Sequence, residues 1–166
     1  MLKNRVIPVL LVRDINLIKG EQFNSWRAVG SPLQAVKVFN RRDVDELVIL
    51  DIQATPAGRG PDLDLVADLA AACFVPLTVG GGITEVDTIR LLLKAGADKV
   101  AINSAAYHDP DLISRAADRF GAQCVVAAID FKPRPGGGWD CFSQCGTEAT
   151  GIDLVERARE LERLGA

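Results

Sequence analysis

The feature that most constrains the fold is a series of short apolar runs that alternate along the chain with helix-like segments. The runs cover residues 6–12, 46–51, 76–79, 99–104 and 124–130. Each is almost continuously apolar, which is typical of a strand covered on both faces, as in a parallel sheet. The sequence therefore predicts an α/β fold in which five strands form one parallel sheet.

Helix signals follow these runs. We expect helices over residues 31–39, 61–72, 84–96 and 109–121, and a charged helix that follows residues 150–153 and extends to residue 165. Ser31-Pro32 has the order of an N-cap followed by proline at the first helical position, and Thr84 with Asp87 resembles a capping box. Segment 14–30 is polar and has no helical period, so we interpret it as a long connection of the kind that is often functional or mobile.

Two parallel architectures accommodate five strand–helix units. A doubly wound sheet is complete with five strands, whereas a (βα)8 barrel needs eight units and about 250 residues. The length of 166 residues suits one domain, and we expect a single domain over residues 1–166. Weak similarity between residues 5–14 and 123–132 hints at an internal repeat, but does not decide between the two architectures.

Composition limits the classes of partner and cofactor. The net charge is -3 and there is no polybasic arm, so the sequence lacks the basic character of nucleic-acid-binding proteins. No apolar run reaches the roughly 18 residues of a membrane span, and the first residues do not resemble a secretory signal, so we expect a cytoplasmic protein. The four cysteines lack metal-ligand spacing and His108 is the only histidine, so we expect no metal site and no cofactor.

Residues 77–83, Leu-Thr-Val-Gly-Gly-Gly-Ile, place three glycines directly after an apolar run. Without Cβ atoms in the turn, backbone N–H groups can converge on an anion, and the N-terminus of a following helix favours negative charge. A phosphate suits this arrangement. The other interpretation is that the glycines make a tight turn that allows close packing, and the turn alone does not distinguish the two.

Two of the predicted strands end on a carboxylate, Asp51 and Asp130. In parallel α/β folds, ligands and catalytic groups gather at the C-terminal ends of the strands. We therefore expect both carboxylates near the candidate site.

Several sequence blocks then point to a family. They are residues 5–8 (Arg-Val-Ile-Pro), 45–52 (Asp-Glu-Leu-Val-Ile-Leu-Asp-Ile), 78–83 (Thr-Val-Gly-Gly-Gly-Ile), 96–106 (Gly-Ala-Asp-Lys-Val-Ala-Ile-Asn-Ser-Ala-Ala) and 128–130 (Ala-Ile-Asp). In this combination the chain resembles, over nearly its whole length, the cyclase subunit of imidazole glycerol phosphate synthase. The resemblance implies a (βα)8 TIM-barrel relative, in which ammonia from a glutaminase subunit travels through the barrel to a bis-phosphorylated ribonucleotide.

The resemblance also implies roles for individual residues. Asp130 matches one of the two general acid–base groups of the family. The remaining matches are a phosphate site at Gly81, Gly82, Asn103 and Ser104, a substrate rim with Lys19, Asp51 and Thr78, and a charged ammonia gate at the opposite end with Arg5, Glu46 and Lys99. For the gate residues, a structural ring of ion pairs is the other interpretation.

One position departs from the family pattern. Leu11 stands where the cyclase has its second catalytic aspartate, and leucine can neither accept nor donate a proton. We therefore expect imidazole formation to be weak or absent. Residues 6–11 and 142–147 resemble instead the amidation-associated paralogues found with surface-polysaccharide amidotransferases, which keep the barrel and the ammonia route but serve another acceptor.

The chain reaches residue 166 just before the sixth strand of that family would begin. We therefore expect an incomplete barrel of five βα units, which self-associates to cover its open strand edges. Two alternatives stay open: a non-catalytic half-barrel that forms oligomers, and a stand-alone flavodoxin-like domain that binds another phosphate compound.

Overall fold

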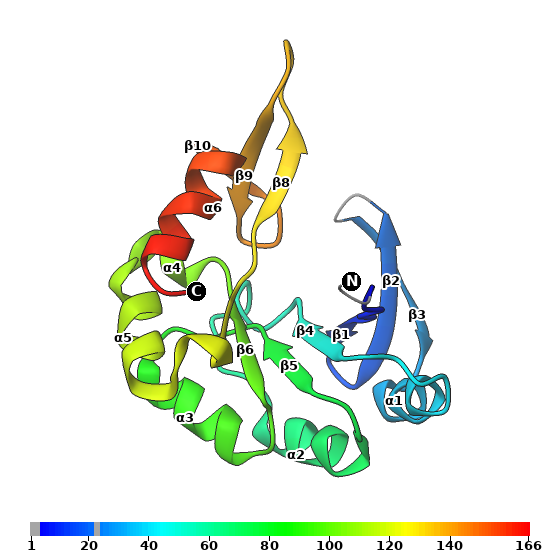
Figure 1. Ribbon diagram of the computed structural model, residues 1–166. Helices are drawn as coiled ribbons and strands as arrows, with labels where there is room; N and C mark the ends of the chain where they lie inside the picture. The colour runs from blue at the N-terminus through cyan, green and yellow to red at the C-terminus, as the bar shows by residue number, and fades with distance from the viewer. Residues whose placement is uncertain (1–3, 22–23) are drawn as a thin grey trace.

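The computed structural model describes residues 4–21 and 24–166, and its main element is a seven-stranded sheet (Figure 1). The strand order is β3-β2-β1-β4-β5-β6-β7. The parallel strands are β1 (Val9–Arg13), β4 (Leu47–Asp51), β5 (Leu77–Gly80), β6 (Lys99–Ile102) and β7 (Val125–Ala127), and β2 (Asn16–Glu21) and β3 (Asn24–Gly30) add an antiparallel hairpin. The predicted α/β fold with a mainly parallel sheet is confirmed. In the described chain the sheet is not a closed barrel, because β3 and β7 stand at its two ends.

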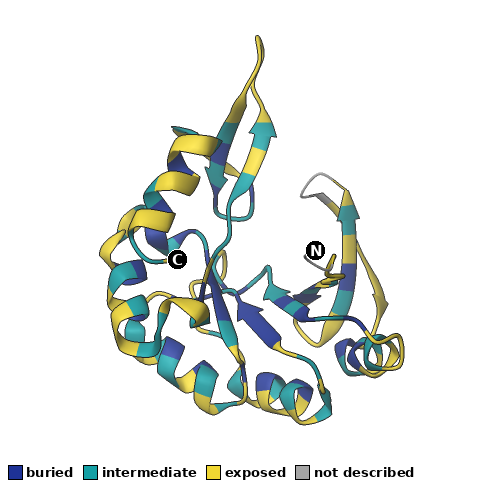
Figure 2. Ribbon diagram, in the orientation of Figure 1, coloured by how far each residue is buried: buried dark blue, intermediate teal, exposed yellow. Residues whose placement is uncertain are grey.

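Five helices lie in an arc along one face of this sheet (Figure 1). They are α1 (Pro32–Asn40), α2 (Leu63–Ala72), α3 (Val86–Lys94), α4 (Ala105–His108) and α5 (Asp111–Phe120), and the short 3-10 helix η1 (Ala122–Cys124) leads into β7. The core lies between helices and sheet, and Figure 2 shows its buried residues concentrated there. Among the described residues, no helix has both the length and the apolar character needed to cross a lipid bilayer.

The parallel strands are aligned so that equivalent positions form rows across the sheet. One row faces the helices and is almost completely buried, and it consists of Leu10, Ile49, Val79, Val100 and Val125. Because side chains alternate along a strand, the next residues point to the other face. That face carries one row of Val9, Val48, Thr78 and Lys99, and a second row of Leu11, Leu50, Gly80, Ala101 and Val126.

A second, smaller sheet projects from the main one (Figure 1). It is antiparallel and consists of β8 (Asp130–Pro133), β9 (Trp139–Ser143) and β10 (Glu148–Asp153), followed by α6 (Leu154–Arg163). Arg157 of α6 holds this part against α4, because its Nη2 donates to the Ala106 carbonyl at 2.7 Å and its guanidinium lies over the Tyr107 ring. The charged helix predicted after residues 150–153 is thus confirmed as α6.

The interpretation of segment 14–30 as a long connection is wrong, because strands β2 and β3 form there. The hairpin pairs with β1 and extends the sheet by two strands. Two register shifts interrupt the pairing of β2 with β3, so the segment lacks the regular alternation that would have predicted strands. Residues 22–23 of this predicted connection lie outside the described residues.

Other predicted boundaries also change. The predicted strand 124–130 ends at Ala127, and Asp130 begins β8 instead of closing a parallel strand. The strand predicted over 6–12 begins only at Val9. The capping box at Thr84 is absent, because Glu85 is the N-cap of α3 and makes no capping bond with its side chain. The strands of the second sheet were not predicted.

Helix α3 offers a matched test of the packing against the sheet. Leu92 is fully buried, whereas its neighbour Leu91 is 42% exposed. We expect Leu92→Ala to lower the free energy of unfolding by about 2–5 kcal/mol because it leaves a cavity in the core, and Leu91→Ala to cost less than about 1 kcal/mol. Urea unfolding of both variants measures the difference, and equal losses would contradict this packing of α3.

Candidate functional site

A cavity of about 160 Å³ opens at the C-terminal ends of β1, β4, β5 and β6. Six of the predicted site residues line it: Asp51, Gly81, Gly82, Asn103, Ser104 and Asp130. They come from four separate segments of the chain. The parallel register explains the meeting of the first five, because each follows or ends a strand at the same edge of the sheet.

The glycine turn is shaped by packing against the loop that follows β4. Gly81 and Gly82 have φ values of 110° and 68°, in the region that favours glycine. A Cβ on Gly81 would lie 2.2 Å from the Asp51 carbonyl oxygen, and one on Gly82 would lie 2.4 Å from the Arg59 carbonyl oxygen. The Gly82 N–H donates to Thr55 Oγ1 at 3.2 Å. Close packing is therefore sufficient to explain both glycines.

Asn103 and Ser104 follow β6 directly, and both line the cavity. Ser104 is buried, and its Oγ accepts the Gln144 N–H at 3.0 Å. Since a hydroxyl both accepts and donates, the Ser104 proton stays available for a ligand oxygen. The Asn103 Oδ1 is buried without a hydrogen-bond partner among the described residues. These two side chains are the strongest evidence for a polar ligand.

The two carboxylates of the cavity differ in their surroundings. Asp51 forms an ion pair with Arg59 at 2.7 Å, and its Oδ1 accepts two main-chain N–H groups of the loop, those of Gln53 and Ala54. This carboxylate therefore organises the β4–α2 loop. Asp130 has no ion pair within 4.0 Å among the described residues, and is the better candidate for ligand contact.

Burial is the largest influence on Asp130, and it raises the pKa of this carboxyl above its usual value. A hydrogen bond from the Asn103 side chain, one from the Gly146 main chain and the charge of Lys132 act in the opposite direction. A raised pKa means that Asp130 holds a proton more readily than an exposed carboxyl does, which is the direction that a general acid requires.

The rest of the wall is mainly apolar and includes residues that the sequence analysis missed. Leu11 lines the cavity together with Leu50, Trp26 and Cys145. Trp26 belongs to β3, and Cys145 lies in the β9–β10 turn, where its Sγ donates to the Ile52 carbonyl at 3.1 Å. Both come from segments whose strands were not predicted, and although segments 14–30 and 142–147 were singled out in the sequence, neither Trp26 nor Cys145 was identified as a site residue.

Two predicted rim residues do not line the cavity. Lys19 is exposed on β2, and its partner in the ladder is Arg27. Thr78 is buried in the row that also contains Val48 and Lys99. This row lies closer to the N-terminal ends of the strands than the row of Leu11 and Leu50 does. The predicted contact of Lys19 and Thr78 with a substrate stays a prediction.

The predicted gate residues lie together at the other end of the strands. Glu46 is buried, and its two carboxylate oxygens accept from Arg5 and from Lys99, the latter at 2.6 Å. The three residues form an ion-pair cluster, and their predicted role as an ammonia gate stays a prediction. Among the described residues, no group of three His, Cys, Asp or Glu side chains is arranged to hold a metal ion.

The raised pKa of Asp130 predicts a pH dependence of stability. The native state holds the Asp130 proton more tightly than the unfolded chain does. The free energy of unfolding therefore falls as the pH rises from 3.8, the ordinary pKa of this carboxyl, through the raised native pKa. We expect Asp130→Asn to be more stable than the unaltered chain at pH 7, and to lose this advantage below pH 3.8. Urea unfolding across this range measures it, and a pH-independent difference would contradict the assigned cause.

The comparison with protein families gives one match. A family model described as "Histidine biosynthesis protein" matches residues 5–166. The match includes every strand of the main sheet and all the residues that line the cavity. The chain therefore belongs to the histidine biosynthesis protein family, and its curved, mainly parallel sheet is that of a partial βα barrel.

Proposed function

We propose that the chain binds a phosphorylated ribonucleotide or sugar in the cavity at the C-terminal ends of the strands, as a relative of the ammonia-dependent cyclase. The observation that carries this proposal is the meeting of Asn103 and Ser104 with Asp130 in one cavity. The position also agrees with the general location of ligand sites in βα barrels. Family membership supports a role related to histidine biosynthesis.

The Ser104 hydroxyl is the direct phosphate donor in this proposal. Its Oγ accepts the Gln144 N–H, which leaves the hydroxyl proton free to be donated to a ligand oxygen. A hydrogen bond to a charged group contributes about 1.5–3 kcal/mol. We therefore expect Ser104→Ala to weaken binding of ribose 5-phosphate by at least about tenfold, since 1.4 kcal/mol corresponds to a factor of ten.

Calorimetric titration with ribose 5-phosphate measures this effect. Ser31→Ala is a matched control, because Ser31 precedes α1 and its side chain makes no capping bond. Equal affinity of the Ser104→Ala variant and the unaltered chain would remove Ser104 from the phosphate site.

We further propose that catalysis by this chain is weak or absent, because Leu11 lines the same cavity as Asp130. A carboxylate at position 11 would share the cavity with Asp130, as a pair of acid–base groups requires. The presence of Leu11 also favours a second candidate function, in which the protein handles ammonia for the amidation of another acceptor. Such a role does not need the pair of acid–base groups that the cyclase uses.

Replacement of Leu11 tests the first of these ideas. We expect Leu11→Asp to raise ammonia-dependent turnover of the bis-phosphorylated ribonucleotide by about 100-fold or more, the usual contribution of a general acid or base. Leu11→Asn should not raise turnover, because the asparagine side chain has nearly the same shape as aspartate but cannot act as a general acid or base. Ammonia is supplied as an ammonium salt, so the assay needs no glutaminase. Turnover by the unaltered chain equal to that of Leu11→Asp would contradict the proposal.

A further inference from the structure

The charges around the cavity are unbalanced for a phosphate site. The only charged residues that line it, within the described part of the chain, are Asp51 and Asp130. Arg59 neutralises Asp51. Arg13 lines the adjoining cavity but not this one. Near a phosphate bound at Ser104, Asp130 is therefore a carboxylate without an ion-pair partner within 4.0 Å among the described residues.

Lys132 does not remove this imbalance. It follows Asp130 by two residues, but its Nζ donates to the Gly146 carbonyl at 2.6 Å and lies 4.2 Å from the centre of the Phe142 ring. These contacts hold the ammonium against β9 and the β9–β10 turn. Its charge acts on Asp130 only at a distance.

Two of the polar side chains that line the cavity, Asn103 and Asp130, offer hydrogen-bond acceptors. The Asn103 Oδ1 is buried without a partner among the described residues. A buried acceptor of this kind costs free energy unless a donor reaches it. The Asn103 oxygen and the Asp130 carboxylate thus form an acceptor pair next to the Ser104 hydroxyl, and that pair is unsuited to phosphate oxygens but suited to N–H groups.

An aromatic ring is present in the same cavity. Trp26 of β3 lines it, in an otherwise apolar wall that includes Leu11 and Leu50. Tryptophan is the side chain whose face attracts cations most strongly. The apolar wall also lowers the local dielectric, which strengthens the interaction between a bound cation and Asp130.

We propose that the cavity selects a phosphomonoester that carries its own positively charged nitrogen, an ammonium or an amidinium group. The nitrogen donates to Asp130 and to the Asn103 Oδ1 and contacts the Trp26 ring, while the phosphate accepts from Ser104. The proposal rests on the phosphate-binding function proposed above. It adds the ligand's charge pattern: a phosphate alone is repelled by Asp130, and an amine within the same molecule turns that repulsion into attraction.

The test compares two sugars that differ in one group, glucosamine 6-phosphate and glucose 6-phosphate, by calorimetric titration near neutral pH. We expect the aminated sugar to bind the unaltered chain at least about tenfold more tightly. N-acetylglucosamine 6-phosphate keeps the nitrogen but not its charge, and should bind no better than glucose 6-phosphate. This three-ligand comparison needs no variant, so it does not depend on how a substitution affects folding.

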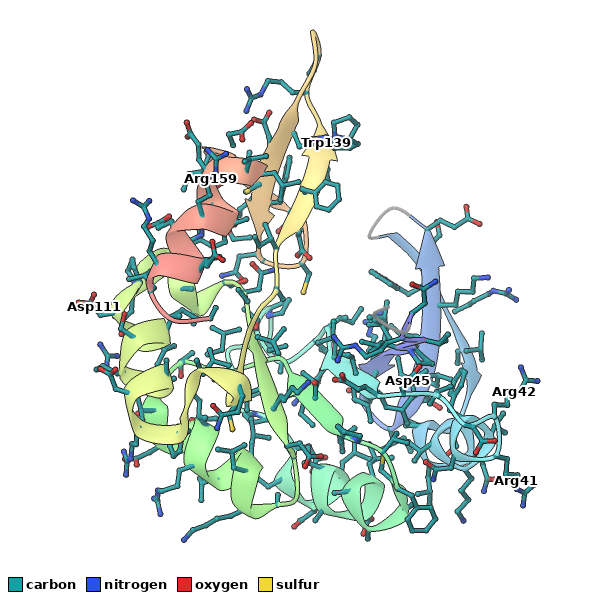
Figure 3. The ribbon with its side chains drawn as sticks, in the orientation of Figure 1. Arg41, Arg42, Asp45, Asp111, Trp139 and Arg159 are labelled. Atoms are coloured by element: carbon teal, nitrogen blue, oxygen red, sulfur yellow. The ribbon has the colours of Figure 1, made fainter. Side chains whose placement is uncertain are left out.

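Asp130→Asn then identifies the residue responsible. We expect this variant to bind glucose 6-phosphate more tightly than the unaltered chain does, and glucosamine 6-phosphate less tightly, so that the two affinities differ by no more than about twofold. Asp140→Asn is the control, because Asp140 is paired with Arg134 on the second sheet and does not line the cavity. Trp26→Leu should reduce the preference for the amine, whereas Trp139→Phe, on the projecting hairpin (Figure 3), should not.

The outcomes separate the two proposals. Equal binding of the two 6-phosphates by the unaltered chain would overturn the selection for a cationic nitrogen and leave phosphate binding intact. Failure of both sugars and of inorganic phosphate to bind would overturn the phosphate function and this inference with it. A tenfold preference that persists in Asp130→Asn would overturn the assignment to Asp130.

Discussion

The parallel register of β1, β4, β5 and β6 is the constraint on which the rest of the structure depends. It aligns one row of side chains beneath the helices and two rows on the opposite face. Because the side-chain period of a strand is two residues, a shift of one residue would turn the buried row outward. The same alignment brings the ends of the strands to one level, so that Asp51, Gly81 and Asn103 meet around one cavity. Core packing and site geometry therefore have the same origin.

The loop after β4 links that register to the site. Asp51 ends the strand and accepts N–H groups from the loop, while Arg59 returns to pair with its carboxylate. The loop can take this path only because Gly81 and Gly82 present no Cβ to it. The glycine turn, which in sequence resembles a phosphate loop, thus serves first to let two loops pack together. The polar groups that remain for a ligand are on the next connection, at Asn103 and Ser104.

The sequence was sufficient to predict the parallel strands and their helices, because apolar runs covered on both faces are a local signal. The parallel order was also sufficient to place Asp51 at the edge that carries the cavity, whereas Gly82 and Ser104 were assigned to one site by the family resemblance. The sequence was insufficient for β2 and β3, whose pairing contains register shifts, and for the second sheet. The contacts of Trp26 and Cys145 with the cavity depend on how those segments fold, so the local sequence did not identify these two residues.

Leu11 and Asp130 together determine what the cavity can do. With an aspartate at position 11, two carboxylates would share a small, mainly apolar space, and each would raise the other's pKa. Leucine removes that coupling and leaves Asp130 as a single carboxylate whose charge no neighbouring side chain pairs among the described residues. A lone acceptor of this kind cannot pass a proton to a partner group across a substrate, but it can hold a cation. Leu11 therefore supports both proposals, the weak or absent cyclase activity and the recognition of a charged nitrogen, because it leaves Asp130 without a second carboxylate.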